Sequence, residues 1–208
     1  MTLQSNRTLG GVGALLMVIS PFLVSGFTLL ADLVGLILVL IAVKGLSDHY
    51  KEASIFNNSL YGVILSIVGG AVFVAALFVT ALSFFINVLG IELSTAFSDP
   101  TAFSKIDWAE VIVWENFWPH VGALLGSLVT LFIFVVVAAI FYRKSLTTLA
   151  EKTGVGRFGT AGLLLLIGAV LIIIVIGFLL IWVALILLTV AFFQIRAEPT
   201  QPPPMTPS

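Results

Sequence analysis

A run of about 38 residues near the C-terminus, residues 158–195, contains no charged side chain. One membrane-spanning helix needs about 20 apolar residues, and two helices need about 40 and a turn. The run therefore predicts either one overlong helix or a tight apolar hairpin. A similar run, residues 8–43, opens the chain and is interrupted by a single charge at Asp32.

Composition places the chain in the membrane. Its 208 residues are 60% hydrophobic and 9% charged, whereas soluble domains carry about 25% charged residues. The apolar residues occur in blocks between short charged clusters, which predicts helices and not the alternating strands of a barrel. Because cysteine is absent, disulfides, zinc–thiolate sites and thiol catalysis are excluded.

The apolar blocks predict about six helical segments. Ser20-Pro21 and Ser25-Gly26 break the first block into two helices, because proline lacks a backbone donor and glycine tolerates positive φ. The second block, strongly apolar over residues 60–89, predicts a long tilted helix. The third, residues 119–142, has the length of a single crossing.

A comparison of the chain with itself favours a hairpin for residues 158–195. A shift of about 151 positions places Gly26 on Gly177 and the following Phe27 on Phe178. Genuine repetition and biased composition both remain open as explanations. A turn at Gly177-Phe178 gives arms of about 16 to 20 residues. It also places Trp182 just past the turn, where an indole prefers the membrane interface.

The charges predict the orientation. In a six-segment arrangement with both termini inside, eight of the nine basic residues lie inside, as the positive-inside rule requires. These are Arg7, Lys44, Lys51, Arg143, Lys144, Lys152, Arg157 and Arg196. The outer loop, residues 91–116, holds Lys105 and five acidic residues. We expect a plasma-membrane protein with cytoplasmic termini.

The overall prediction is an all-α, polytopic transmembrane bundle in residues 1–196, with terminal hairpins flanking a central helix pair. Residues 197–208 are proline-rich and predict a disordered inner tail. A short outer helix is expected at 107–118, and residues 144–153 predict an amphipathic helix on the inner leaflet. Six crossings, or two crossings and two wedge-like hairpins, both satisfy the charge pattern.

Small and aromatic residues are the candidate contact residues. Small residues let helix backbones approach in lipid, either within the chain or between two copies; the candidates are Gly10, Ala14, Gly69, Gly122 and Gly126. Tryptophans anchor helices at the interface or dock a partner or lipid; the candidates are Trp108, Trp114, Trp118 and Trp182.

Asp32 is the candidate intramembrane polar site. An acid in a membrane segment often marks an ion or proton path. It lies about six residues beyond Gly26, or roughly 9 Å along a helix, so the sequence favours an interfacial or helix-packing role, with transport as the alternative. His49 and His120 are isolated, and no cofactor or metal site is expected.

Three stretches resemble a known family: SNRTLGGVGALL, VGLILVLIAVKGLSDHYKEASIFNNSLYG and FYRKSLTTLAEKTGVGRFGTAGLLLLIGA. The family comprises uncharacterised, largely archaeal integral membrane proteins that are catalogued as a domain of unknown function. The resemblance implies a prokaryotic plasma membrane and supplies no activity.

The sequence favours a non-catalytic protein that organises the membrane or assembles with another membrane component. Its partners would be the lipid bilayer and a second copy or another membrane protein, with no nucleic acid. The alternative is a small transporter or channel subunit that uses Asp32. An enzyme is not expected, because the sequence offers no acid–base pair, nucleophile–base set or metal-ligand cluster.

Overall fold

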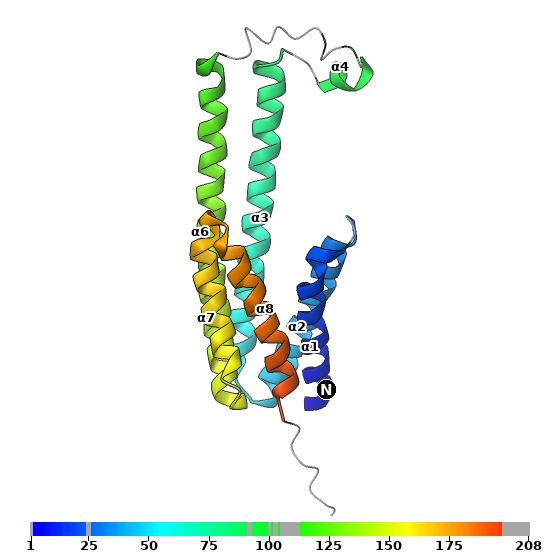
Figure 1. Ribbon diagram of the computed structural model, residues 1–208, viewed down its shortest axis with the longest axis vertical. Helices are drawn as coiled ribbons and strands as arrows, with labels where there is room; N and C mark the ends of the chain where they lie inside the picture. The colour runs from blue at the N-terminus through cyan, green and yellow to red at the C-terminus, as the bar shows by residue number, and fades with distance from the viewer. Residues whose placement is uncertain are drawn as a thin grey trace, which may run out of the picture. The chain divides into compact units, whose positions relative to one another are not determined.

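The computed structural model describes residues 2–23, 26–90, 93–99, 101, 104 and 113–196, and within them regular structure is entirely helical. The all-α prediction is confirmed (Figure 1). The α-helices are α1 (Leu3–Ile19), α2 (Thr28–His49), α3 (Ala53–Asn87), α4 (Leu93–Ser98), α6 (Trp114–Thr153), α7 (Arg157–Val170) and α8 (Ile176–Gln194). Two 3₁₀ turns, η1 (Ser20–Phe22) and η3 (Leu171–Ile174), follow α1 and α7.

The chain forms two compact units. The first, here called the hairpin unit, comprises Met1–Gly62 and Ala139–Ser208, and the second, the pair unit, comprises Val63–Ala138. The hairpin unit contains α1, α2, α7 and α8 with the start of α3 and the end of α6. The pair unit contains the remainder of α3 and α6 together with α4.

The first hairpin turns where the sequence predicts. Pro21 lies in η1, and Gly26 has a φ of 113°, which favours glycine. The two arms approach closely at Gly13 and Gly35: a Cβ on either residue would lie 2.6 Å from the carbonyl oxygen of the other. Glycine is therefore needed at both positions for α1 and α2 to pack.

The second hairpin turns earlier than predicted. Residues 158–195 form a hairpin, but the chain reverses through η3 and Val175, whose φ is 64°. The predicted turn at Gly177-Phe178 is wrong, because both residues belong to α8. Gly177 serves instead as a packing residue: a Cβ there would overlap the carbonyl oxygen of Gly168 on α7.

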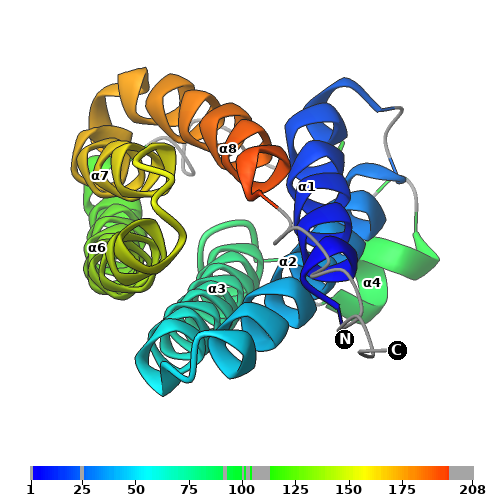
Figure 2. The same cartoon turned by 90° about the horizontal axis from the view of Figure 1, so that it is seen from below.

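The helix α8 joins the two hairpins. It packs against α7 and also against α1, as Figure 2 shows. At the contact with α1, the Phe192 ring lies so close to Gly10 that a Cβ on the glycine would overlap it.

The start of α3 and the end of α6 meet through Ser59 and Ser145, whose hydroxyl oxygens are 2.8 Å apart.

The core of the hairpin unit lies at the end that holds the loops between α2 and α3 and between α6 and α7. The rings of Phe158 and Phe192 are fully buried and meet edge to face, with centroids 5.1 Å apart. Other buried side chains of this core include Leu46, Ile55, Leu149 and Ile195. Where helices are surrounded by lipid, close van der Waals packing of such side chains holds the helices together.

The prediction of a separate amphipathic helix on the inner leaflet is wrong. Residues 144–153 are the last turns of α6, which continues without a break to Thr153. Leu146 and Leu149 are 5% and 0% exposed because they pack into the core. Their apolar spacing therefore reflects protein packing and not a separate surface helix. Gly154, with a φ of 71°, follows the end of α6.

The pair unit is held by aromatic and small residues. Gly69 on α3 faces Phe134 on α6, and a Cβ on Gly69 would lie 2.5 Å from the Phe134 Cβ. Toward the other end, His120 and Ser83 are 3.2 Å apart, and His120 meets the Phe84 ring edge to face. The helix predicted at 107–118 lies largely outside the described residues, as does the predicted C-terminal tail.

Five of the described helices are long and apolar enough to cross a membrane, which indicates a membrane protein. The longest are α3 and α6, with 35 and 40 residues. These five are α2, α3, α6, α7 together with η3, and α8. The helix α1, with 17 residues, is not among them. It is nevertheless packed along α2 as one arm of the first hairpin.

Candidate functional site at the hairpin tips

A groove of about 920 Å³ lies where the two terminal hairpins meet at their turns. Its walls are mostly apolar side chains of α1, α2 and α8 and the turns that join them. The residues that line it include Met17, Ser20, Phe22, Leu29, Asp32, Leu36, Val175, Phe178, Ile181, Trp182 and Leu185. We call this the tip groove, and its polar side chains are those of Ser20, Asp32 and Trp182.

Asp32 is bonded within its own hairpin. The hydroxyl of Ser20, at the end of α1, donates a hydrogen bond to the carboxylate of Asp32 on α2. Ser20 is 1% exposed, and its hydroxyl is also 3.1 Å from the Met17 carbonyl oxygen. Since a hydroxyl has one proton, the two acceptors share that donor. Asp32 thus has a neutral partner that fixes the turn.

Trp182 connects the two hairpins. Its indole N–H donates to the carbonyl oxygen of Val18 at 3.0 Å, and its ring meets Phe22 with centroids 5.9 Å apart. The last four carbonyls of a helix have no partner within the helix. Trp182 therefore satisfies an open carbonyl at the end of α1. The predicted interfacial position of its ring stays a prediction.

The hairpin turns expose large apolar side chains. Phe22 and Phe27 in the first turn are 74% and 66% exposed, and Ile173 and Val175 in the second are both 71% exposed. The described residues of the turns carry no charge. Such a surface is compatible with hydrocarbon and costly in water. The tips are therefore suited to a lipid environment.

The described residues do not assemble a metal centre. Among them, no group of three or more histidine, cysteine, aspartate or glutamate side chains could hold an ion. The His49 ring packs on Tyr50 with centroids 4.9 Å apart, and His120 lies beside Ser83. The Asp32 carboxylate accepts a hydrogen bond from the Ser20 hydroxyl. Such a carboxylate can bind a donor group or hold a turn closed.

Polar contacts also gather at the loop end of the hairpin unit. Glu52 pairs with Lys152 at 3.2 Å and so joins the α2–α3 loop to the end of α6. A hydrogen bond from Ser54 and, after it, the hydrogen bond and charge of Lys152 lower the pKa of the Glu52 carboxyl. Arg7 donates to the carbonyl oxygen of Ile195 at 3.4 Å, so the N-terminal segment is tied to the end of α8.

The predicted packing residues have different surroundings. Gly10 and Ala14 are buried, and Gly10 meets Phe192. Gly69 faces Phe134. At Gly122 and Gly126, by contrast, a Cβ would meet no described atom within 4 Å, so neither glycine makes a helix contact within the described chain.

Two of the four predicted aromatic side chains belong to the described residues. Trp118 is 56% exposed on α6, and Trp182 is half-buried in the tip groove. Trp108 and the side chain of Trp114 lie outside the described residues.

Sequence reasoning missed two contacts of the hairpins. The sequence indicates only a turn at Ser20, although a serine before a turn and an acid shortly after it are able to meet across a hairpin. The second contact is between Asn6 and Gly45. The Asn6 side chain is 0% exposed and lies directly against Gly45 on α2. An asparagine in a terminal segment gave no signal of burial.

Comparison with known proteins bears out the expected family. Residues 31–186 match the family described as "Protein of unknown function (DUF996)". The chain is also 29% identical over 195 residues to the "Uncharacterized protein MJ1644" of Methanocaldococcus jannaschii, with 94% of each chain covered. No solved structure matches the chain.

Proposed function

The chain belongs to the DUF996 family of proteins of unknown function, and from its structure we propose that it organises the membrane without catalysis. In this proposal α3 and α6 cross the bilayer. The two terminal hairpins enter from the side of the basic loops and end within the hydrocarbon. The protein then acts as a wedge in one leaflet of the membrane.

The surface of the hairpin turns carries this proposal. A turn that reached water would expose polar groups, but Phe22, Ile173 and Val175 are each at least 71% exposed. Backbone groups within hydrocarbon need internal partners. The Trp182 N–H supplies one to Val18, and the Ser20 hydroxyl lies within reach of Met17. The turns thus combine an apolar exterior with hydrogen bonds that do not require water.

The length of α1 supports this depth for the first hairpin, whereas α2, α7 with η3, and α8 are each long enough to cross a membrane. From Arg7 to the end of α1 at Ile19 the rise is about 18 Å, which is well short of a hydrocarbon core of about 30 Å. Since α1 and α2 are arms of one hairpin, α2 turns at the same depth as α1. The helices α3 and α6, with 35 and 40 residues, have ample length to cross.

The basic residues support an orientation. Three basic residues lie at the loop end of the hairpin unit. They are Arg7 near the start of α1, Lys44 near the end of α2 and Lys152 at the end of α6. Placing this end in the cytoplasm satisfies the positive-inside rule and leaves both termini cytoplasmic in the plasma membrane. The acidic outer loop then lies on the opposite side.

Cysteine accessibility tests the depth directly, because the natural chain contains no cysteine. Single variants Phe22→Cys and Ile173→Cys report the two tips, Lys51→Cys the inner loop and Thr101→Cys the outer loop. We expect a membrane-impermeant maleimide to label the two loop positions from opposite sides and neither tip from either side. Labelling of both tips from the outer side would establish six crossings and overturn the proposal.

Vesicle shape tests the activity. Reconstitution from one side should reduce the diameter of liposomes, because apolar volume added to one leaflet favours curvature. A charge at the tip, Phe22→Asp, should abolish the effect, since a carboxylate in hydrocarbon costs about 3 kcal/mol. Thr147→Asp, at an exposed position on the last turns of α6, is the matched control. Equal vesicle diameters with and without protein would contradict the role.

Assembly with a second copy is a further candidate role. It is favoured by Gly122 and Gly126, at which an added Cβ would meet no atom of the described residues within 4 Å. Their spacing suits close approach of two helices. Cross-linking of the reconstituted protein tests it, with Gly122→Leu as the variant expected to lose the dimer. A monomer in both cases would leave only the wedge role.

A further inference from the structure

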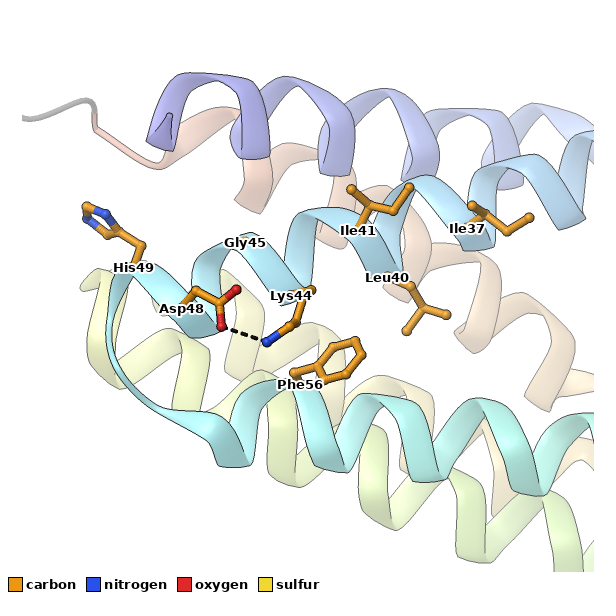
Figure 3. Close-up of a pocket in the computed structure, with 8 residues that line it drawn as sticks. All are labelled: Ile37, Leu40, Ile41, Lys44, Gly45, Asp48, His49 and Phe56. Atoms are coloured by element: carbon orange, nitrogen blue, oxygen red, sulfur yellow. Dashed lines mark hydrogen bonds and ion pairs between the residues drawn. The ribbon is translucent and has the colours of Figure 1, made fainter. Parts of the chain in front are cut away.

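An amphipathic groove lies between α2 and α3 at the loop end of the hairpin unit. Two adjoining hollows, of about 680 and 250 Å³, share Lys44, Asp48 and Phe56 in their walls. The larger hollow continues along α2 to Ile41 and Ile37. Figure 3 shows Lys44 on α2 and Phe56 on α3 pointing toward one another across it.

Polarity changes along this groove in one direction. Its deep end is apolar, with Ile37 and Ile41 47% and 38% exposed. Its other end, at the α2–α3 loop, is lined by Lys44, Lys51 and Asn57. A phospholipid lying along α2 has the same order, with apolar chains toward the membrane centre and a charged headgroup at the interface.

The charges at the headgroup end favour an anion. Lys44 and Lys51 contribute two positive charges and Asp48 one negative charge, while Glu52 is paired with Lys152. The Lys44 ammonium is 2.7 Å from the Asp48 carboxylate and 5.3 Å from the centre of the Phe56 ring. The side chains of Lys44 and Asp48 are 53% and 63% exposed, so a ligand can reach both.

We infer that this groove binds a phospholipid with an anionic headgroup. The phosphate lies between Lys44 and Lys51, with the amide of Asn57 as a hydrogen-bond donor. One apolar chain follows Phe56, Ile41 and Ile37. The site requires only that the loop end of the hairpin unit lies at the membrane surface, so it does not depend on how deeply the hairpins insert.

Asp48 gives the site a distinctive response. Its carboxylate repels an anionic headgroup and competes with the phosphate for the Lys44 ammonium. Asp48→Asn should therefore strengthen binding, whereas Lys44→Gln and Lys51→Gln should weaken it. A role of these residues in stability alone would not move lipid affinity in opposite directions.

Native mass spectrometry of the full-length protein in detergent tests the inference. The probes are phosphatidylglycerol and phosphatidylcholine with identical acyl chains. We expect tighter retention of phosphatidylglycerol, about fivefold weaker binding on removal of either lysine, and stronger binding in Asp48→Asn. Lys144→Gln is the matched control, because Lys144 lies over the Phe141 ring at 5.8 Å and does not line the groove. Its phosphatidylglycerol affinity should equal that of the wild type.

Three results would overturn the inference. The first is equal affinity for the two lipids, and the second is a loss in Lys144→Gln as large as that in Lys44→Gln. The third is displacement of phosphatidylglycerol by an equimolar amount of soluble glycerol phosphate, which would identify a simple anion site. Ile41→Ser supplies the test of the apolar end, and we expect it to weaken the binding of both lipids.

Discussion

Ser20, at the end of α1, donates its hydroxyl hydrogen bond to the carboxylate of Asp32 on α2 and thereby closes the first hairpin across its turn. The hydroxyl is buried, whereas the carboxylate is only partly covered. The bond gives the most conspicuous acid of the chain a packing role. Removal of the Ser20 hydroxyl and removal of the Asp32 carboxylate should therefore destabilise the protein by different amounts.

Ser20→Ala should destabilise the protein by about 2 kcal/mol, because it leaves the Asp32 carboxylate without its donor. Asp32→Asn should cost less, since its amide oxygen still accepts from Ser20. Unfolding by sodium dodecyl sulfate in mixed micelles measures both. The double variant Ser20→Ala/Asp32→Leu should recover most of the loss, and an unchanged Ser20→Ala protein would refute this role.

Gly13→Ala should destabilise the first hairpin by about 2 kcal/mol, since overpacking forces helices apart. The new Cβ would lie 2.6 Å from the Gly35 carbonyl oxygen and 2.8 Å from the Leu38 Cβ. Gly122→Ala is the control on an open surface, and it should be neutral or stabilise by up to about 1 kcal/mol through helix propensity. Thermal unfolding of the monomeric proteins in detergent measures both variants. An equal loss of stability in Gly13→Ala and Gly122→Ala would contradict close packing of α1 on α2.

Asn6 and Gly45 should be energetically coupled. Both polar atoms of the Asn6 side chain are buried and make no hydrogen bond within the described part of the chain. A Cβ on Gly45 would overlap that side chain. We expect Gly45→Ala to destabilise the protein by about 2 kcal/mol through overpacking, and Asn6→Ala to destabilise it less. The double variant should be more stable than the sum of the single changes by at least about 1 kcal/mol. An additive cycle would show that the two residues do not touch.

Glu52 should make stability depend on pH. Its pKa is lowered below 4.5 by the Ser54 hydroxyl and then by Lys152, so its ionised form is favoured in the folded protein. This contribution is complete above pH 4.5, the ordinary pKa of the group, and is lost as the pH falls through the lowered pKa.

The test compares the unfolding midpoints of wild type and Glu52→Gln as a function of pH. The variant should be less stable at pH 7, and the difference should shrink in acid and in high salt. Glu151→Gln, on the exposed side of the last turns of α6, controls for the loss of one negative charge. A difference between wild type and Glu52→Gln that stays constant with pH would contradict the assignment.

Local signals predicted the elements of the fold well. Proline and glycine placed the first turn at η1 and Gly26, because their backbone preferences act independently of neighbours. The same reasoning misplaced the second turn. Gly177 is needed for contact with Gly168 on the adjacent arm, and this demand looks identical in sequence to a turn signal.

The candidate site could be predicted only in part. Asp32 was identifiable because an acid in an apolar run is rare. Its partner, Ser20, was not, since a hydrogen bond between two helices depends on their register and distance. For the same reason the apolar spacing in residues 144–153 predicts a helix on the membrane surface, whereas Leu146 and Leu149 pack into the core around Phe158.

The sequence by itself determined that the chain is helical and suited to a membrane, because apolar length and charge spacing act through the solvent alone. Only the tertiary structure decided which residues meet. Three contacts depend on how neighbouring helices are aligned. They are the close approach of Gly13 and Gly35, the hydrogen bond from Trp182 to Val18 and the hydrogen bond from Ser20 to Asp32. That alignment is a collective result of packing, which no single stretch of sequence encodes.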